Sequence, residues 1–168
     1  MNKILILNTL GTEALGEDVS ALLAEKQRDL EVMDTTKMDI RHCIGCNHCF
    51  LKTPGVCSVK DDYEQILRRI AHTQDLWLIS GTRFGFLNYQ GKRVMDRILP
   101  MITMNLIFKD GEMRHRLRYE PVNVGLVYLG EGNSDLLNEW CQRAALNLGG
   151  HSLGAFPMEK IKEAVSCM

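Results

Sequence analysis

Residues 4–16 read ILILNTLGTEALG, and they decide the class of the fold. The first four form a continuous aliphatic run, which is typical of a parallel strand buried on both faces. A loop rich in glycine and threonine follows, and Glu17 and Asp18 after it indicate the start of a helix. This stretch therefore predicts half of a βαβ unit.

The same alternation of strand and helix continues along the chain. The pattern predicts four more strands, at residues 30–33, 76–79, 122–129 and, more weakly and at an edge, 152–156. Apolar faces at helical spacing predict helices at residues 63–71, 94–102, 137–148 and 157–165. Pro100 is expected to kink or end the second of these helices.

Five strands alternating with helices predict an α/β fold, with an open five-stranded parallel sheet of order 2-1-3-4-5 and helices on both faces. The Asp110-Gly111 turn signal predicts an inserted hairpin near residues 106–119. In such a sheet, ligands bind where the loops after the first and third strands meet. The cysteine stretch at 43–57 leads away from the second strand, so we expect it near the same edge.

Composition limits the class of protein. With 168 residues and 45% hydrophobic content, residues 1–168 are expected to form one domain. The net charge of −1 and the scattered basic residues argue against a nucleic-acid partner. The apolar run at residues 4–7 is too short for a membrane span or a signal peptide, which predicts a cytoplasmic protein with no membrane partner.

Residues 43–57, CIGCNHCFLKTPGVC, place four of the six cysteines at C-x2-C-x2-C-x7-C spacing. Disulfide frameworks are rare in a reducing compartment, so this spacing favours metal or redox chemistry. Three interpretations stay open: a [4Fe-4S] site, a structural or redox-active thiol turn, and a zinc site. The four cysteines concerned are Cys43, Cys46, Cys49 and Cys57.

Two loops at the predicted crevice are candidate ligand sites. A phosphate cradle after the first strand would use Thr9, Gly11, Thr12 and Gly16, against the alternative of a plain βα loop. The loop after the third strand suits a flat ring, against the alternative of an apolar cover for the core. Its candidate residues are Thr82, Arg83, Phe84, Gly85 and Phe86. Asp96 and Arg97 are expected to form a helix-surface pair.

Four segments together resemble the flavodoxin-like NAD(P)H-dependent FMN reductase family, near its iron–sulfur flavoprotein branch. They are the cysteine stretch with its Asp61-Asp62 end, GTRFGF at 81–86, Lys92 with Asp96 and Arg97, and DGEMRHRLRY at 110–119. The resemblance implies FMN, with its phosphate in the first loop and its ring on residues 82–86. It also implies an oxidoreductase that takes electrons from NAD(P)H and passes them to a small-molecule or protein acceptor.

The resemblance implies a homo-oligomer as well, and it requires no catalytic side chain because the cofactor performs the hydride chemistry. The first alternative is an iron–sulfur flavoprotein electron carrier with [4Fe-4S] on the four cysteines. The second is a flavodoxin-fold partner protein that has lost FMN. The acidic residues Glu13, Glu17 and Asp18 favour this second alternative, since carboxylates oppose a phosphate dianion.

Overall fold

The computed structural model describes residues 4–13, 15 and 30–168. The predicted helix that begins at Glu17 and Asp18 lies outside the described residues, and so does Gly16. The strands are β1 (Ile4–Asn8), β2 (Leu30–Asp34), β3 (Asp75–Arg83), β4 (Phe86–Leu87), β5 (Ile102–Lys109), β6 (Glu112–Leu117), β7 (Val122–Leu129) and β8 (Gly149–Pro157). The helices are η1 (Thr35–Lys37), α2 (His48–Leu51), α3 (Tyr63–Ile70), α4 (Tyr89–Met95), η2 (Leu99–Met101), α5 (Ser134–Asn147), η3 (Met158–Lys160) and α6 (Ile161–Ser166).

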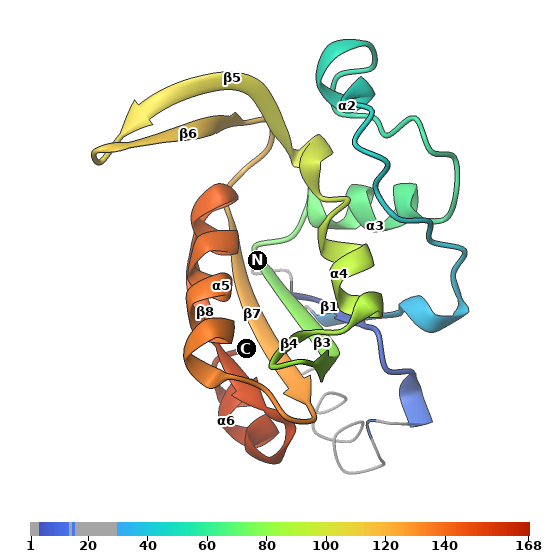
Figure 1. Cartoon of the computed structure of the whole chain (residues 1–168), viewed down its shortest axis with the longest axis vertical. Helices are drawn as coiled ribbons and strands as arrows, with labels where there is room; N and C mark the ends of the chain where they lie inside the picture. Colours follow the sequence, from blue (N-terminus) through green and yellow to red (C-terminus); the bar gives the residue numbers. More distant parts are fainter. Residues whose placement is uncertain (1–3, 14, 16–29) are drawn as a thin grey trace.

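The main sheet has the order β2-β1-β3-β7-β8, and each of these neighbours pairs in parallel. Because β7 and β8 are the fourth and fifth predicted strands, the expected order 2-1-3-4-5 is confirmed (Figure 1). The edge position of the last strand is also confirmed. β4 adds a short antiparallel partner to the end of β3.

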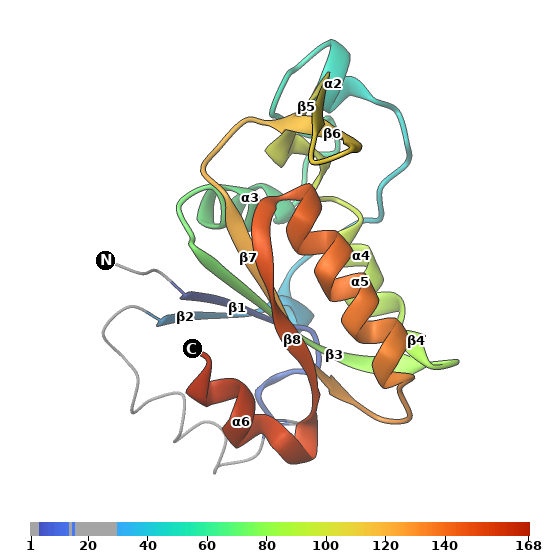
Figure 2. The ribbon, with the colours of Figure 1, turned by 90° about the vertical axis from the view of Figure 1, so that its left-hand side faces the viewer.

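Helices cover both faces of the sheet, as predicted. Leu5 and Leu7 of β1 join a core with α3, α4 and α5, whereas Ile4 and Ile6 join a second core with α6. Figure 2 shows α5 and α6 on opposite sides of the strands. The strands read as continuous apolar runs because successive side chains enter two different cores. None of the helices in the described part of the chain has the length and apolar character needed to cross a membrane.

The predicted hairpin is present as β5 and β6, which form a separate antiparallel ribbon. Asp110 and Gly111 connect the two strands with φ angles of 53° and 79°. Positive φ at both central residues matches the right-handed twist of a two-stranded ribbon, which is why Asp-Gly suits the turn. The hairpin projects away from the main sheet (Figure 1).

The predicted helix at 94–102 is too long. α4 ends at Met95, the next turn is the 3-10 helix η2, and Ile102 already belongs to β5. Pro100 explains the break, since it has no backbone N–H and restricts the residue before it. Ile98, Leu99 and Ile102 still pack on the core, so their apolar character is explained without a continuous helix.

The cysteine stretch lies at the other end of the sheet from the one predicted. α2 packs on η2 and β5, and the ring of Phe50 stacks on His115 of β6 with 5.8 Å between centroids. Figure 1 shows α2 beside the base of the hairpin, whereas the arrowheads of β3 and β7 point the opposite way. Residues 38–47 form no helix or strand, and an extended segment of that length can carry the chain past α3.

Candidate functional site

The cysteine stretch is a loop with one short helix, shaped by three residues in the left-handed region. Gly45, Asn47 and Gly55 have φ angles of 65°, 56° and 83°. Asn47 starts α2, and the backbone N–H of Gly55 donates to the carbonyl of Cys49 at 3.0 Å. This turn brings the chain back from Cys49 toward Cys57, which explains how a seven-residue gap can return a fourth cysteine to the first three.

The hairpin supports this loop from outside. A Cβ atom at Gly55 would lie 2.8 Å from Cδ of Arg118, and the φ of 83° disfavours any other residue there. Arg118 in turn donates from Nε to the carbonyl of Pro100 at 3.2 Å. Arg118, the residue that follows β6, therefore packs between η2 and the cysteine loop.

All four cysteines of the motif line one small cavity. They carry free thiols, and their exposure decreases from Cys46, which is exposed, through Cys43 and Cys57 to Cys49, which is buried. Burial raises the pKa of Cys49, and the nearby thiols of Cys57, Cys43 and Cys46 raise it further. The four thiols therefore share one cavity, and their role as metal ligands stays a prediction.

The outermost thiol has a different environment. The Sγ atom of Cys46 lies 3.2 Å from Oγ of Ser58. Hydrogen bonds from this hydroxyl and from the backbone N–H of His48 lower the pKa of Cys46. The loop therefore offers polar partners to a thiolate on its open side and a dry environment on its inner side.

A single metal ion requires ligands that are grouped closely around it. Zn–S bonds of 2.3 Å place tetrahedral ligands about 3.8 Å apart. In the described part of the chain, no three His, Cys, Asp or Glu side chains are grouped closely enough to hold one metal ion. A cuboidal cluster accepts four thiolates at wider separations. The cavity holds only about 20 Å³, so a cluster would enter only if the loop opened.

Arg97 is a candidate functional residue, and its predicted position on the surface is wrong. The predicted surface pair with Asp96 does not form: Asp96 pairs with Lys92, and the Arg97 side chain is 1% exposed. Arg97 instead forms a buried ion pair with Asp61 and donates from Nη2 to Sγ of Cys57 at 3.3 Å. The residues that meet here are 36 and 40 positions apart, so no local pattern could have revealed the contact.

The buried pair gives the protein an acid-sensitive element. Burial would raise the pKa of Asp61, but hydrogen bonds from Arg97 and from the backbone N–H groups of Arg41 and Tyr63 hold that pKa below its usual value. A carboxylate with a lowered pKa in the folded state stabilises the fold above its unfolded pKa of about 3.9. This contribution is lost as the pH falls through the folded-state pKa.

We therefore expect the free energy of unfolding to fall steeply below about pH 4, and Asp61→Asn to reduce that dependence. Urea unfolding at a series of pH values measures both curves. Parallel curves for the two proteins would show that Asp61 does not carry this acid sensitivity.

The predicted phosphate loop lies at the carboxyl end of β1. Both donors of Thr9, its backbone N–H and its hydroxyl, bind the carbonyl of Ile79, at 2.9 and 3.0 Å. Gly11 has a φ of 86°, and Thr12 is exposed beside it. The buried Nδ2 of Asn8 has no hydrogen-bond partner among the described residues, so an unused donor lies beside this loop. The role of Thr9, Gly11, Thr12 and Gly16 stays a prediction.

The predicted ring-binding loop joins β3 to β4. Phe84 is 93% exposed at a φ of 55°, and the guanidinium of Arg83 lies 5.3 Å from its ring centroid. Phe86 packs edge-on against Trp140 at 6.1 Å, and Thr82 donates its hydroxyl to the carbonyl of Leu129. Phe84 therefore faces outward, while Gly85, whose carbonyl accepts from the backbone N–H of Asn133, joins Phe86 and Thr82 in holding the loop to the fold.

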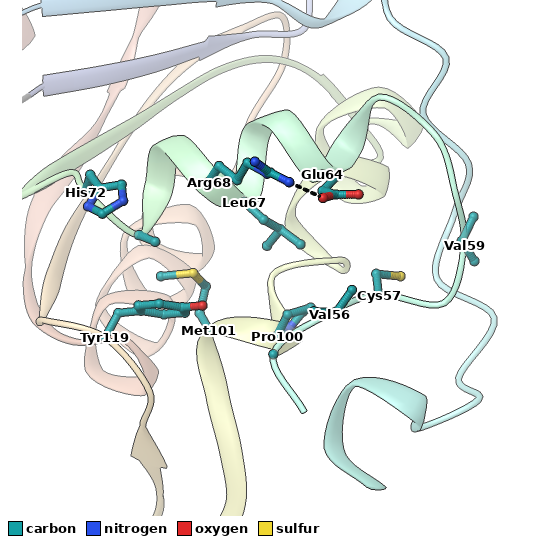
Figure 3. Close-up of a pocket in the computed structure, with 12 residues that line it drawn as sticks. Val56, Cys57, Val59, Glu64, Leu67, Arg68, His72, Pro100, Met101 and Tyr119 are labelled. Carbon is teal, nitrogen blue, oxygen red and sulfur yellow. Dashed lines mark hydrogen bonds and ion pairs between the residues drawn. The ribbon is translucent and has the colours of Figure 1, made fainter. Parts of the chain in front are cut away.

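A separate pocket of about 250 Å³ lies beside the cysteine loop (Figure 3). Leu67 of α3 and Met101 of η2 point into it, with Tyr119 near one end and Cys57 near the other. The ion pair between Glu64 and Arg68 lies along its rim. Apolar side chains, among them Leu67 and Met101, line much of the pocket. Cys57 lines both this pocket and the four-thiol cavity.

Comparison with known proteins supports the predicted resemblance. No protein-family model matches the sequence. Over 90 residues, 54% of this chain, the sequence is 31% identical to an iron–sulfur flavoprotein of Methanocaldococcus jannaschii. The match covers 46% of that protein, so the chain spans less than half of the length of this curated relative.

Solved structures share the fold at low sequence identity. RosB, solved with 8-demethyl-8-formylriboflavin-5'-phosphate, has a TM-score of 0.64 and 14% identity, over 94% of this chain and 64% of its own. An FMN-dependent NADH-azoreductase from Bacillus anthracis, in complex with FMN, has a TM-score of 0.60 and 12% identity, over 99% and 93%. General stress protein 14 of Treponema denticola, also with FMN, has a TM-score of 0.54 and 9% identity, over 99% and 94%. The fold is therefore flavodoxin-like, as the sequence predicted.

Proposed function

We propose that this protein is a flavin-dependent oxidoreductase of the iron–sulfur flavoprotein type, with a [4Fe-4S] cluster on Cys43, Cys46, Cys49 and Cys57. One observation carries the proposal: four thiols at this spacing line a single cavity at the surface of a flavodoxin-like fold. The similarity to an iron–sulfur flavoprotein over 90 residues supports it. A bound cluster supplies reversible transfer of single electrons.

The chain contributes the environment of such a cluster. The buried Cys49 would bind on the dry side, whereas Cys46 and its partner Ser58 lie on the open side. Gly45 and Gly55 let the loop turn without steric strain, because both have positive φ. The four thiolates would be held by one loop that is braced by Arg97 and Arg118.

We propose further that FMN binds at the carboxyl ends of β1 and β3 and is reduced by NAD(P)H. The topological switch point lies there, and the buried Nδ2 of Asn8, which has no partner among the described residues, lies beside the first loop. Gly11, Thr12 and Gly16 would hold the phosphate, and the exposed ring of Phe84 would pack on the flavin beside Arg83. No side chain need exchange a proton with the flavin.

A homo-oligomer is part of the proposal. The cysteine loop and the loop after β3 lie at opposite ends of the main sheet (Figure 1). A second copy would allow the cysteine loop of one chain to face the flavin of the other. The hairpin offers apolar side chains for such contacts, since Met104, Leu106 and Phe108 are more than half exposed. The electron acceptor would be a small molecule or a protein.

Absorption spectra test the flavin part of the proposal. Anaerobically purified protein supplied with FMN is expected to show flavin bands that bleach on addition of NADH or NADPH. A protein that does not take up FMN would instead support the alternative of a flavodoxin-fold partner protein without flavin.

Phe84→Ala is expected to weaken FMN binding by about 2- to 10-fold, because a stacked aromatic pair contributes about 0.5–1.5 kcal/mol. Val32→Ala is the control, since Val32 is 39% exposed on β2 and belongs to neither proposed site. Fluorescence titration with FMN measures both affinities. Equal affinities for the two variants would exclude Phe84 from the flavin site.

A further inference from the structure

Arg97 bridges the two ends of the cysteine loop. It follows α4, and its Nη1 donates to the carbonyl of Arg41 at 3.0 Å while its Nη2 donates to the carbonyl of Val59 at 3.3 Å. Arg41 precedes the first cysteine of the motif and Val59 follows the last. The guanidinium therefore bonds to the backbone just before and just after the four-cysteine motif.

The guanidinium is fixed in place by further contacts. Asp61 binds Nη1, and the ring of Tyr63 lies 4.5 Å from the guanidinium carbon. The hydroxyl of Tyr63 is itself anchored on the carbonyl of Val94 at 2.6 Å. Arginine does not lose its proton in proteins, so a full positive charge stays in this buried position.

One contact of this charge is made to a sulfur atom. Nη2 of Arg97 lies 3.3 Å from Sγ of Cys57, and sulfur is a weak acceptor compared with the carbonyl groups nearby. As a ligand of an iron–sulfur cluster, however, the same sulfur would carry negative charge. A hydrogen bond and a positive charge at a ligand sulfur stabilise the more negative, reduced form of a cluster.

We propose that Arg97 is a positioning residue for the four-cysteine site. It holds the two ends of the loop together, and it raises the reduction potential of the cluster through its hydrogen bond to Cys57. The inference rests on the proposed function, because it requires that the four thiols hold a cluster. It assigns a role to a side chain that lies outside the cysteine motif itself.

The decisive variant removes the charge without leaving its partner unpaired. Arg97→Met combined with Asp61→Asn replaces a buried ion pair by neutral groups, a change that proteins often tolerate. Arg97→Lys is the second variant, because it keeps the charge but loses the planar fork that reaches several acceptors at once. Lys92→Met is the control, since it removes a neighbouring positive charge that is 43% exposed.

Reduction potentials measured by anaerobic dye titration give the primary result. The double variant is expected to be about tenfold harder to reduce, which is a negative shift of 59 mV for a one-electron couple. Arg97→Lys should shift the same way by a smaller amount, and Lys92→Met should match the wild type. Removal of iron by a chelator should be about 10-fold faster in the double variant, since outer partners of metal ligands affect affinity by that order.

The outcomes separate this inference from the proposed function. A wild-type protein that binds no iron contradicts the proposed function. A wild-type protein that binds a cluster, with unchanged potential in both Arg97 variants, overturns the role of Arg97 alone. If the double variant does not fold, the potential of Arg97→Lys decides the question: a negative shift supports the role, and the wild-type value overturns it.

Discussion

Asp61→Ala is expected to lower the free energy of unfolding by about 3–5 kcal/mol, because it leaves a guanidinium buried without its counter-charge. The side chains of Arg97 and Asp61 are 1% and 0% exposed. Arginine cannot relieve the cost by losing a proton. Urea unfolding of the metal-free protein at neutral pH measures the change.

Asp96→Ala is the matched control for this prediction. Asp96 pairs with Lys92, and the two side chains are 48% and 43% exposed. Exposed pairs of this kind contribute about 0–1 kcal/mol. Equal losses in the two variants would mean that the pair of Asp61 and Arg97 does not stabilise the fold as its burial indicates.

Cys46→Ser is expected to abolish stable binding of the cluster. The substitution removes one of four thiolate ligands, but Cys46 is exposed, so the fold should keep its stability. Cys167→Ser is the matched control, because Cys167 is also an exposed cysteine and lies outside the motif. Iron and acid-labile sulfide per chain, measured after anaerobic purification, should be near zero in the first variant and unchanged in the second.

If Cys46→Ser retains the full iron content of Cys167→Ser, then Cys46 is not a ligand. Circular dichroism and urea unfolding of both variants show whether a loss of iron follows from loss of a ligand or from loss of the fold. The expected result is the same unfolding midpoint for the two metal-free proteins.

The sequence contains most of the information that determines the sheet. Residues 4–7 and 76–79 are continuous apolar runs because β1 and β3 are buried on both faces, and that pattern predicts parallel strands. Asp110-Gly111 likewise predicts its own turn. The end of α4 was harder to predict, because Ile98, Leu99 and Ile102 continue an apolar helical pattern beyond the break at Pro100.

The candidate site is only partly encoded in local pattern. Spacing predicts that Cys43, Cys46, Cys49 and Cys57 come together, because the chain between them is short. It does not predict the end of the sheet at which they lie, since an extended segment before them can lead in either direction. The burial of Arg97 depends on partners 36 and 40 positions away in the sequence. The local sequence shows only an Asp-Arg pair after a helix, which is typical of a surface.

The measurement that tests the central claim most directly is the iron and acid-labile sulfide content of the wild-type protein purified without oxygen, together with its visible spectrum. Four iron and four sulfide per chain are expected, with a broad iron–sulfur shoulder that disappears in Cys46→Ser. A protein without iron or sulfide after anaerobic purification and reconstitution, or one that holds a single zinc, would contradict it.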